Sequence, residues 1–134
     1  MLNIIKRLSY DKVFGILTRP ALEIILENKK SFDCCLIDFN NLKKLNKLIG
    51  YNQVNSIIFN LFKEYKQYNN SIIGRWFSGD EILIVDNLIR LKICILKKIA
   101  YKHGMSFKTF YFENKNLKQI EIEIDKINYN YVKI

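Results

Sequence analysis

This chain of 134 residues has few of the residues that interrupt regular structure, with one proline and five glycines. It contains no low-complexity segment and no internal repeat. No apolar run approaches the roughly 20 residues of a membrane span, and the N-terminus lacks the pattern of a signal peptide. These absences argue against a disordered, repetitive or membrane protein. They favour a single cytoplasmic domain, residues 1–134, that is long enough to bury a small core.

Cysteine and histidine are also scarce, which limits the metal sites that the chain can build. The three cysteines, Cys34, Cys35 and Cys94, lie in apolar segments without the spacing of a zinc site. We expect them to be reduced core residues of a cytoplasmic protein. The single histidine, His103, precedes Gly104 at a predicted helix end, so we expect a structural rather than a catalytic residue there.

Acidic residues are outnumbered by basic ones, 13 against 22, and the net charge is +9. The lysines are spread along the chain, and no cluster of basic and aromatic residues points to a nucleic-acid duplex. Two interpretations stay open. One is a solvated basic surface, and the other is attraction for a phosphate-bearing substrate such as a nucleoside triphosphate. We do not expect a nucleic-acid partner.

Residues 72–85, IIGRWFSGDEILIV, organise the predicted fold. They read as two short apolar strands joined by a turn at residues 78–81, because apolar runs of this length between turn residues favour strands. Asp80 and Glu81 then lie at the open end of a sheet. Taken alone, such a pair is more typical of a solvated hairpin tip than of a metal site.

A second acidic position changes that interpretation. Asp38 lies near the carboxyl end of residues 32–39, a predicted buried strand. If this strand pairs with the hairpin, Asp38, Asp80 and Glu81 converge, and carboxylates on one rim repel each other unless a cation lies between them. Their oxygens suit Mg²⁺ or Mn²⁺, the ions that activate a 3′-hydroxyl and neutralise a triphosphate in nucleotidyl transfer.

Three segments together resemble a known family, in the right order and at near-family spacing. Residues 11–23, DKVFGILTRPALE, are similar to the motif D-x-L-T-G-L-x-N-R-x-x-L-E, and residues 38–46 with Gly50 and the SGDE turn complete the set. From Asp11 to about Tyr129, the chain resembles a GGDEF domain, the catalytic domain of diguanylate cyclases. The resemblance implies a fold shared distantly with polymerase palms and with minimal CRISPR polymerase-like cyclases.

The resemblance assigns metal-binding roles to matching residues. Asp38, the backbone carbonyl of Phe39 and Asp80 would bind Mg²⁺ or Mn²⁺. Glu81 would lie near the attacking 3′-hydroxyl or support the metal.

It also assigns nucleotide-binding roles. Gly79, with Ser78 in place of the first signature glycine, would let the triphosphate approach backbone N–H groups. Lys43 would contact phosphate, and Asn46 and Asn55 would read the purine edge. The alternative for both asparagines is an ordinary position on a helix surface or at a helix start.

Several positions depart from the family pattern. Asn55 stands where the family has an aspartate, and because an amide both donates and accepts, we expect ATP as well as GTP to be a substrate. Asn40 replaces a second aspartate, and Phe77 is one extra residue before the turn. Residues 68–72 lack the family's inhibitory R-x-x-D motif, so we expect no product inhibition through such a site.

Apolar periodicity and turn residues predict the remaining elements. Helices are expected over residues 1–10, 20–28, 41–48, 53–68, 88–103 and 116–127, and strands over residues 32–39, within 72–85, and over 105–112 and 129–134. This order predicts an α+β fold, with a ferredoxin-like or palm sheet of about five strands and helices packed on one face.

Two classes of function stay open at this stage. The first is a cyclase that condenses two purine nucleoside triphosphates, ATP or GTP, into a cyclic dinucleotide second messenger. Because each protomer would hold one nucleotide, it implies a homodimer, at least transiently, and the CRISPR-type likeness suggests anti-phage signalling. The second is a catalytically degenerate domain that binds a nucleotide or a partner. Three retained acids, Asp38, Asp80 and Glu81, favour the cyclase. A polymerase-like module would need a long basic groove.

Overall fold

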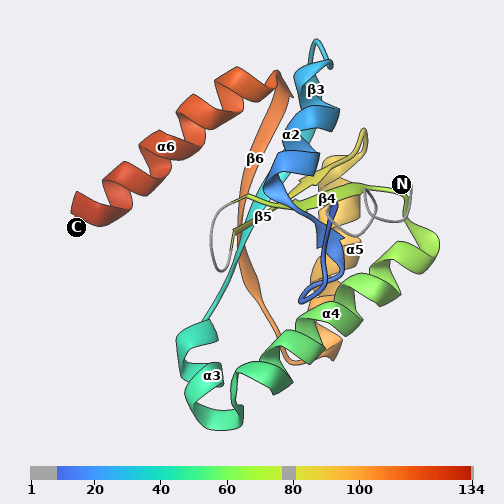
Figure 1. The fold of residues 1–134 in the computed structure, drawn as a ribbon, viewed down its shortest axis with the longest axis vertical. Helices are drawn as coiled ribbons and strands as arrows, with labels where there is room; N and C mark the ends of the chain where they lie inside the picture. The colour runs from blue at the N-terminus through green and yellow to red at the C-terminus, as the bar shows by residue number, and fades with distance from the viewer. Residues whose placement is uncertain (1–8, 77–80, 134) are drawn as a thin grey trace.

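A six-stranded sheet forms the centre of the computed structural model, which describes residues 9–76 and 81–133 (Figure 1). Its order is β1-β2-β4-β5-β3-β6, and β2 and β4 form the parallel pair among antiparallel neighbours. The strands are β1 (Tyr10–Asp11), β2 (Ile16–Leu17), β3 (Phe32–Phe39), β4 (Ile72–Arg75), β5 (Glu81–Val85) and β6 (Phe107–Lys115). The α+β prediction is confirmed. The short strands β1 and β2 were not predicted, because two paired residues leave no periodic pattern in a sequence.

The helices follow local signals in the sequence. Thr18 caps α2 (Arg19–Glu27), since its hydroxyl accepts a hydrogen bond from the Ala21 amide at 3.4 Å, and Pro20 lies in the first turn. At the last helix, Asn116 and Gln119 form a reciprocal pair of side-chain to backbone hydrogen bonds, each at 2.9 Å. The helices are α2 (Arg19–Glu27), α3 (Leu42–Ile49), α4 (Tyr51–Tyr68), α5 (Ile89–Lys102) and α6 (Leu117–Lys133).

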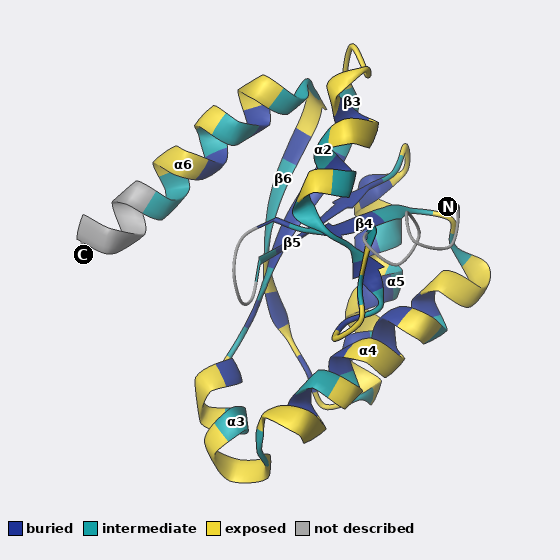
Figure 2. Ribbon diagram, in the orientation of Figure 1, coloured by how far each residue is buried: buried dark blue, intermediate teal, exposed yellow. Residues whose placement is uncertain are grey.

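Helices cover both faces of the sheet, so the prediction of helices on one face is wrong. The central strands carry nearly continuous apolar runs, FDCCLIDF in β3 and EILIV in β5, and such runs are typical of strands buried on both sides. The buried residues of these strands are dark blue on the ribbon in Figure 2. The α4/α5 face includes Ile37, Ile58 and Ile93. The α2/α6 face includes Leu36, Leu22 and Ile120.

The C-terminal segment also differs from its prediction. An edge strand was expected over residues 129–134, but α6 continues to Lys133 and runs away from the sheet (Figure 1). Ile120 and Ile124 repeat at helical spacing, and residues 117–133 contain no glycine or proline that would end the helix. Strand β6 is shifted as well, to Phe107–Lys115. No helix within residues 9–76 or 81–133 combines the length and apolar character that crossing a bilayer requires.

The cysteines divide into two groups. Cys34 and Cys35 are fully buried in β3, as predicted, whereas Cys94 is exposed on α5, so its assignment to the core is wrong. Cys94 lies one position after buried Ile93, on the side of the helix that turns toward solvent. Burial raises the pKa of Cys34, and it raises the pKa of Cys35 to about 12.

We therefore expect thiol reagents to distinguish these residues. Only the thiolate is nucleophilic, so native protein should react rapidly at Cys94 and slowly at Cys34 and Cys35. Titration with an aromatic disulfide reagent, followed by mass spectrometry, should find Cys94 labelled first. Full labelling should require a denaturant, and a Cys94→Ser protein should show no rapid phase.

Candidate active site

Two candidate carboxylates face each other across neighbouring strands. Asp38, the penultimate residue of β3, is in register with Glu81, the first residue of β5. Residues opposed in an antiparallel pair project from the same face with their Cβ atoms about 4.5–5.5 Å apart. Asp38 is half-buried, and the Oε2 atom of Glu81 is buried. The register therefore places Asp38 opposite Glu81, whereas Asp80, the third residue of the predicted group, lies outside the described residues.

A lysine extends this row on the other side of Asp38. Strand β6 places Lys108 in register with Asp38, so Glu81, Asp38 and Lys108 lie side by side on the α2/α6 face. Lys108 is exposed. Lys108 was not predicted as a site residue, because a lysine in an alternating strand is ordinary until the register is known.

The chain turns sharply after Asp38 and enters α3. Asn41 has a left-handed backbone with φ 59°, a conformation that asparagine tolerates better than most residues. Asn40 anchors the turn to the start of β6. Its amide donates to the Ser106 carbonyl at 2.9 Å, and its side chain donates to the Ser106 hydroxyl at 3.0 Å. Asn40, which replaces a family aspartate, therefore fixes the start of α3 relative to the strand end.

Phe39, the last residue of β3, packs its side chain into the core. Phe39 is 5% exposed, and its ring packs edge-on against Phe62 at 6.3 Å and Phe107 at 5.9 Å between centroids. Because the side chain faces the core, any contribution of Phe39 to a metal site comes from its backbone carbonyl, as the resemblance implied.

The predicted nucleotide-binding residues lie on the two helices that follow. Asn46 is on the inner side of α3, one turn after buried Leu42, and its Oδ1 atom is buried and accepts no hydrogen bond from the described residues. Lys43 is exposed on the same helix, and Asn55 is half-buried on α4. A buried carbonyl oxygen without a donor is costly, and it is a position that an amino group of a ligand would satisfy.

Three predicted site residues, Ser78, Gly79 and Asp80, lie outside the described residues, as does Phe77. The residues that flank them are described, and the Trp76 amide donates to the Glu81 carbonyl at 3.0 Å. In the described ranges, no group of three or more histidine, cysteine, aspartate or glutamate side chains is arranged to hold a metal ion.

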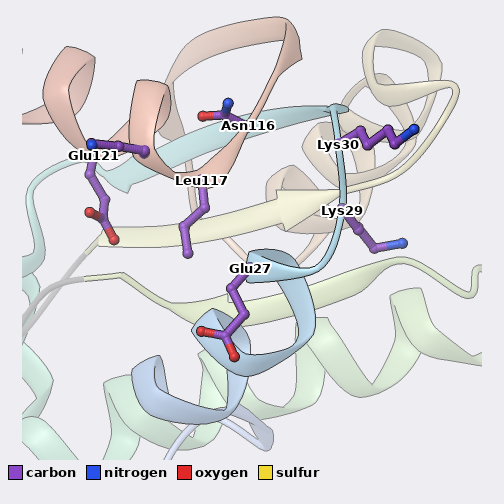
Figure 3. A pocket seen from close by; sticks show the side chains of 7 residues that line it. Glu27, Lys29, Lys30, Asn116, Leu117 and Glu121 are labelled. Atoms are coloured by element: carbon purple, nitrogen blue, oxygen red, sulfur yellow. The ribbon is translucent and has the colours of Figure 1, made fainter.

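A separate cavity of about 510 Å³ opens at the other end of the sheet (Figure 3). Lys29 and Lys30 come from the connection before β3, and Asn116 and Glu121 come from the start of α6. Strand β3 separates this cavity from Asp38 by about 20 Å, at roughly 3.3 Å per residue. Its lining mixes cations with carboxylates and includes none of the predicted site residues, so we do not assign the active site to it.

Comparison with known proteins supports the fold. The sequence matches no protein-family model and no curated protein. The structure is similar to that of a microbial GGDEF domain studied with bis-(3′,5′)-cyclic di-GMP, with a TM-score of 0.72 and 18% identity, over 84% of this chain and 80% of the other. It is also similar to a diguanylate cyclase/phosphodiesterase from Caldicellulosiruptor saccharolyticus, with a TM-score of 0.66 and 17% identity, over 85% of this chain and 79% of the other.

A third similar structure is that of the diguanylate cyclase SiaD from Pseudomonas aeruginosa in complex with its activator SiaC. The TM-score is 0.63 at 14% identity, over 91% of this chain and 57% of SiaD. Likeness at such identities establishes the fold and leaves the activity open. This chain has the fold of a GGDEF domain, as its sequence motifs predicted.

Proposed function

We propose that this chain is a metal-dependent nucleotidyltransferase that condenses two purine nucleoside triphosphates into a cyclic dinucleotide. The observation that carries the proposal is the register of Asp38 with Glu81 at one end of a GGDEF-type sheet. The same sheet end leads directly into α3, which holds a buried, unsatisfied amide oxygen of Asn46. Carboxylates that could hold a cation, and an amide on the following helix that could read a base, are the parts that a nucleotidyl transfer site needs.

The carboxylates fit a divalent cation. Mg²⁺ usually binds through one or two carboxylates and completes its shell with water and substrate phosphates, so Asp38 and Glu81 suffice as the described ligands. Asp80 and the Phe39 carbonyl would complete the set that the resemblance implies. When bound, the cation would lower the pKa of a 3′-hydroxyl and neutralise the triphosphate.

The remaining residues would bind and orient the substrate. The purine edge would meet the Asn46 oxygen, and the exposed ammonium group of Lys43 would attract phosphate. Each 3′-oxygen attacks the α-phosphorus of the other nucleotide, the bond to pyrophosphate breaks, and the hydroxyl proton leaves to solvent. Two such steps join two triphosphates and release two pyrophosphates. Since one site holds one nucleotide, the reaction proceeds in a homodimer that forms at least transiently.

Incubation with each nucleoside triphosphate tests this function. Mass spectrometry should detect a cyclic dinucleotide in the presence of Mg²⁺ or Mn²⁺, and chelation should abolish it. If no triphosphate yields product with either metal, the proposal is wrong. A role in anti-phage signalling is part of the proposal, and loss of protection in plaque counts on cells with an Asp38→Asn protein would support it.

The position of Lys108 favours one alternative, a degenerate domain that binds a nucleotide without turnover. Lys108 is in register with Asp38, so its ammonium group could neutralise the carboxylates in place of a metal ion. Calorimetric titration separates the two functions. Nucleotide binding that needs no metal, together with absence of product, would identify the degenerate form.

Base selection is expected to be relaxed at Asn55. A carboxylate matches the two donors of the guanine edge, whereas an amide opposes one of them and also complements adenine. Asn55→Asp should therefore raise the preference for GTP over ATP about 5- to 150-fold. Competition between equal ATP and GTP measures this ratio. Asn52→Asp is the matched control, because Asn52 is exposed on the same helix. An unchanged ratio in Asn55→Asp would show that another group selects the base.

A further inference from the structure

One arginine is in direct contact with the residue at which β4 leads into the candidate turn. The guanidinium carbon of Arg19 lies 3.9 Å from the centre of the Trp76 ring, and its Nη1 donates to the Trp76 carbonyl at 2.7 Å. We propose that Arg19 is a positioning residue, which holds Trp76 and thereby sets the separation of Asp38 and Glu81. This inference rests on the proposed function. Arg19 lies in the opening motif, but its role there was not evident from sequence.

Arg19 is itself held from two sides. Its Nε pairs with Glu23 Oε1 at 2.6 Å, one turn further along α2, and its Nη2 lies 3.9 Å from Glu121 Oε1 of α6. The Arg19 side chain is 30% exposed, so these contacts are partly shielded from water. A planar guanidinium can stack and donate in fixed directions at the same time, which an ammonium cannot do.

The backbone beneath Arg19 is equally constrained. Helix α2 packs closely on β4 at Gly74, where an added Cβ would lie 3.0 Å from Leu22 side-chain atoms. Because Gly74 has no side chain, the helix can approach the strand this closely. Arg19 therefore reaches Trp76 from a helix whose distance from the strand is fixed by contact.

Trp76 is hydrogen-bonded to Glu81, a candidate catalytic residue. Trp76 is 2% exposed and belongs to the core of the α2/α6 face, and its amide donates to the Glu81 carbonyl at 3.0 Å. Glu81 is in turn in register with Asp38. A shift of Trp76 thus moves one carboxylate relative to the other, and displacement of about 1 Å at a reacting centre can cost about 100-fold in rate.

The test compares Arg19→Gln with a matched control, Arg90→Gln. Arg90 makes the same kinds of contact on the α4/α5 face, lying 4.3 Å from the Tyr111 ring centre and pairing with Glu113 at 2.6 Å. We expect Arg19→Gln to lower kcat about 10- to 100-fold while KM changes less than about 3-fold. Arg90→Gln should leave both constants unchanged. Arg19→Lys keeps the charge but loses the planar guanidinium donors, so its kcat should lie between those of wild type and Arg19→Gln.

Fluorescence supplies a second readout that does not depend on turnover. Trp76 is the only tryptophan of the chain, so acrylamide quenching of its emission reports how well this buried ring is shielded from solvent. Quenching should increase in Arg19→Gln and stay unchanged in Arg90→Gln. Should Arg19→Gln fail to fold, the same two measurements on Arg19→Lys decide the question.

The outcomes separate the two proposals. If the wild-type protein forms no product from any nucleoside triphosphate, the proposed cyclase function is wrong. The quenching experiment alone then shows whether Arg19 holds Trp76. Equal kcat and equal quenching in Arg19→Gln and Arg90→Gln overturn the role of Arg19. A loss of kcat without a matching rise in KM, together with increased quenching, supports it.

Discussion

Replacement of Asp38 by asparagine is expected to reduce cyclic dinucleotide formation at least about 1,000-fold. A bound divalent cation stabilises transition-state charge by several kcal/mol, and each 1.36 kcal/mol corresponds to a factor of about ten in rate. Loss of a carboxylate that holds the cation would remove this stabilisation. Asparagine keeps the shape of Asp38 but removes its charge. Since Asp38 is half-buried at the end of β3, the fold should remain intact. Radiolabelled nucleotide and thin-layer chromatography measure the rate.

Two further variants make this result specific. Asp33→Asn is the matched control, because Asp33 lies on the same strand at the opposite end, where its Oδ1 accepts a hydrogen bond from the Asn114 amide at 2.7 Å. Its turnover should stay within about twofold of wild type, as expected for a substitution away from the chemistry. Asp80→Ala should be as inactive as Asp38→Asn. Undiminished turnover in either Asp38→Asn or Asp80→Ala would overturn the assignment of a carboxylate metal site.

Truncation of Phe62 is expected to be the most destabilising of the changes considered. Its side chain is fully buried on α4 and packs against Phe39, which anchors the end of β3. Replacing a buried phenylalanine by alanine costs about 3–5 kcal/mol, a large part of the 5–15 kcal/mol that stabilises a typical domain. Urea denaturation followed by circular dichroism measures this loss.

The control for Phe62 is a phenylalanine on the same helix. Phe59 is 37% exposed, so Phe59→Ala should cost markedly less than Phe62→Ala in the free energy of unfolding. Similar losses in both variants would mean that the end of β3 is not supported by the core in the way the structure indicates.

Sequence and structure agree where the pattern is local and strong. The apolar run that ends at Asp38, the hairpin and the amphipathic helices were all predicted from periodicity, and they place Asp38 and Glu81 at one sheet end. Two kinds of feature could not be read from the sequence. The register that sets Lys108 beside Asp38 depends on pairing between distant strands. Whether helices cover one or both faces of the sheet depends on where they pack, although the unbroken apolar runs of β3 and β5 are typical of strands buried on both sides.

The roles of single residues also differ in how far the sequence indicates them. The motif predicts that Asn46 reads the purine edge; the structure shows its Oδ1 atom buried, and the role stays a prediction. Arg19 stood in a quoted motif without a role, because the partner that explains it, Trp76, is 57 positions away in the chain. Sequence shows which side chains are present, while long-range contacts decide which of them act on one another.

The short link between β3 and α3 makes this site sensitive to length as well as to composition. Asn40 and Asn41 join the strand that carries Asp38 to the helix that carries Asn46. One residue inserted at the start of α3 would rotate all later positions by about 100°, since an α-helix has 3.6 residues per turn. Such an insertion would carry Asn46 off the inner side of the helix without changing a single side chain of the site. In homologues of this chain, the number of residues between the positions of Asp38 and Asn46 should therefore vary less than the identities of those residues.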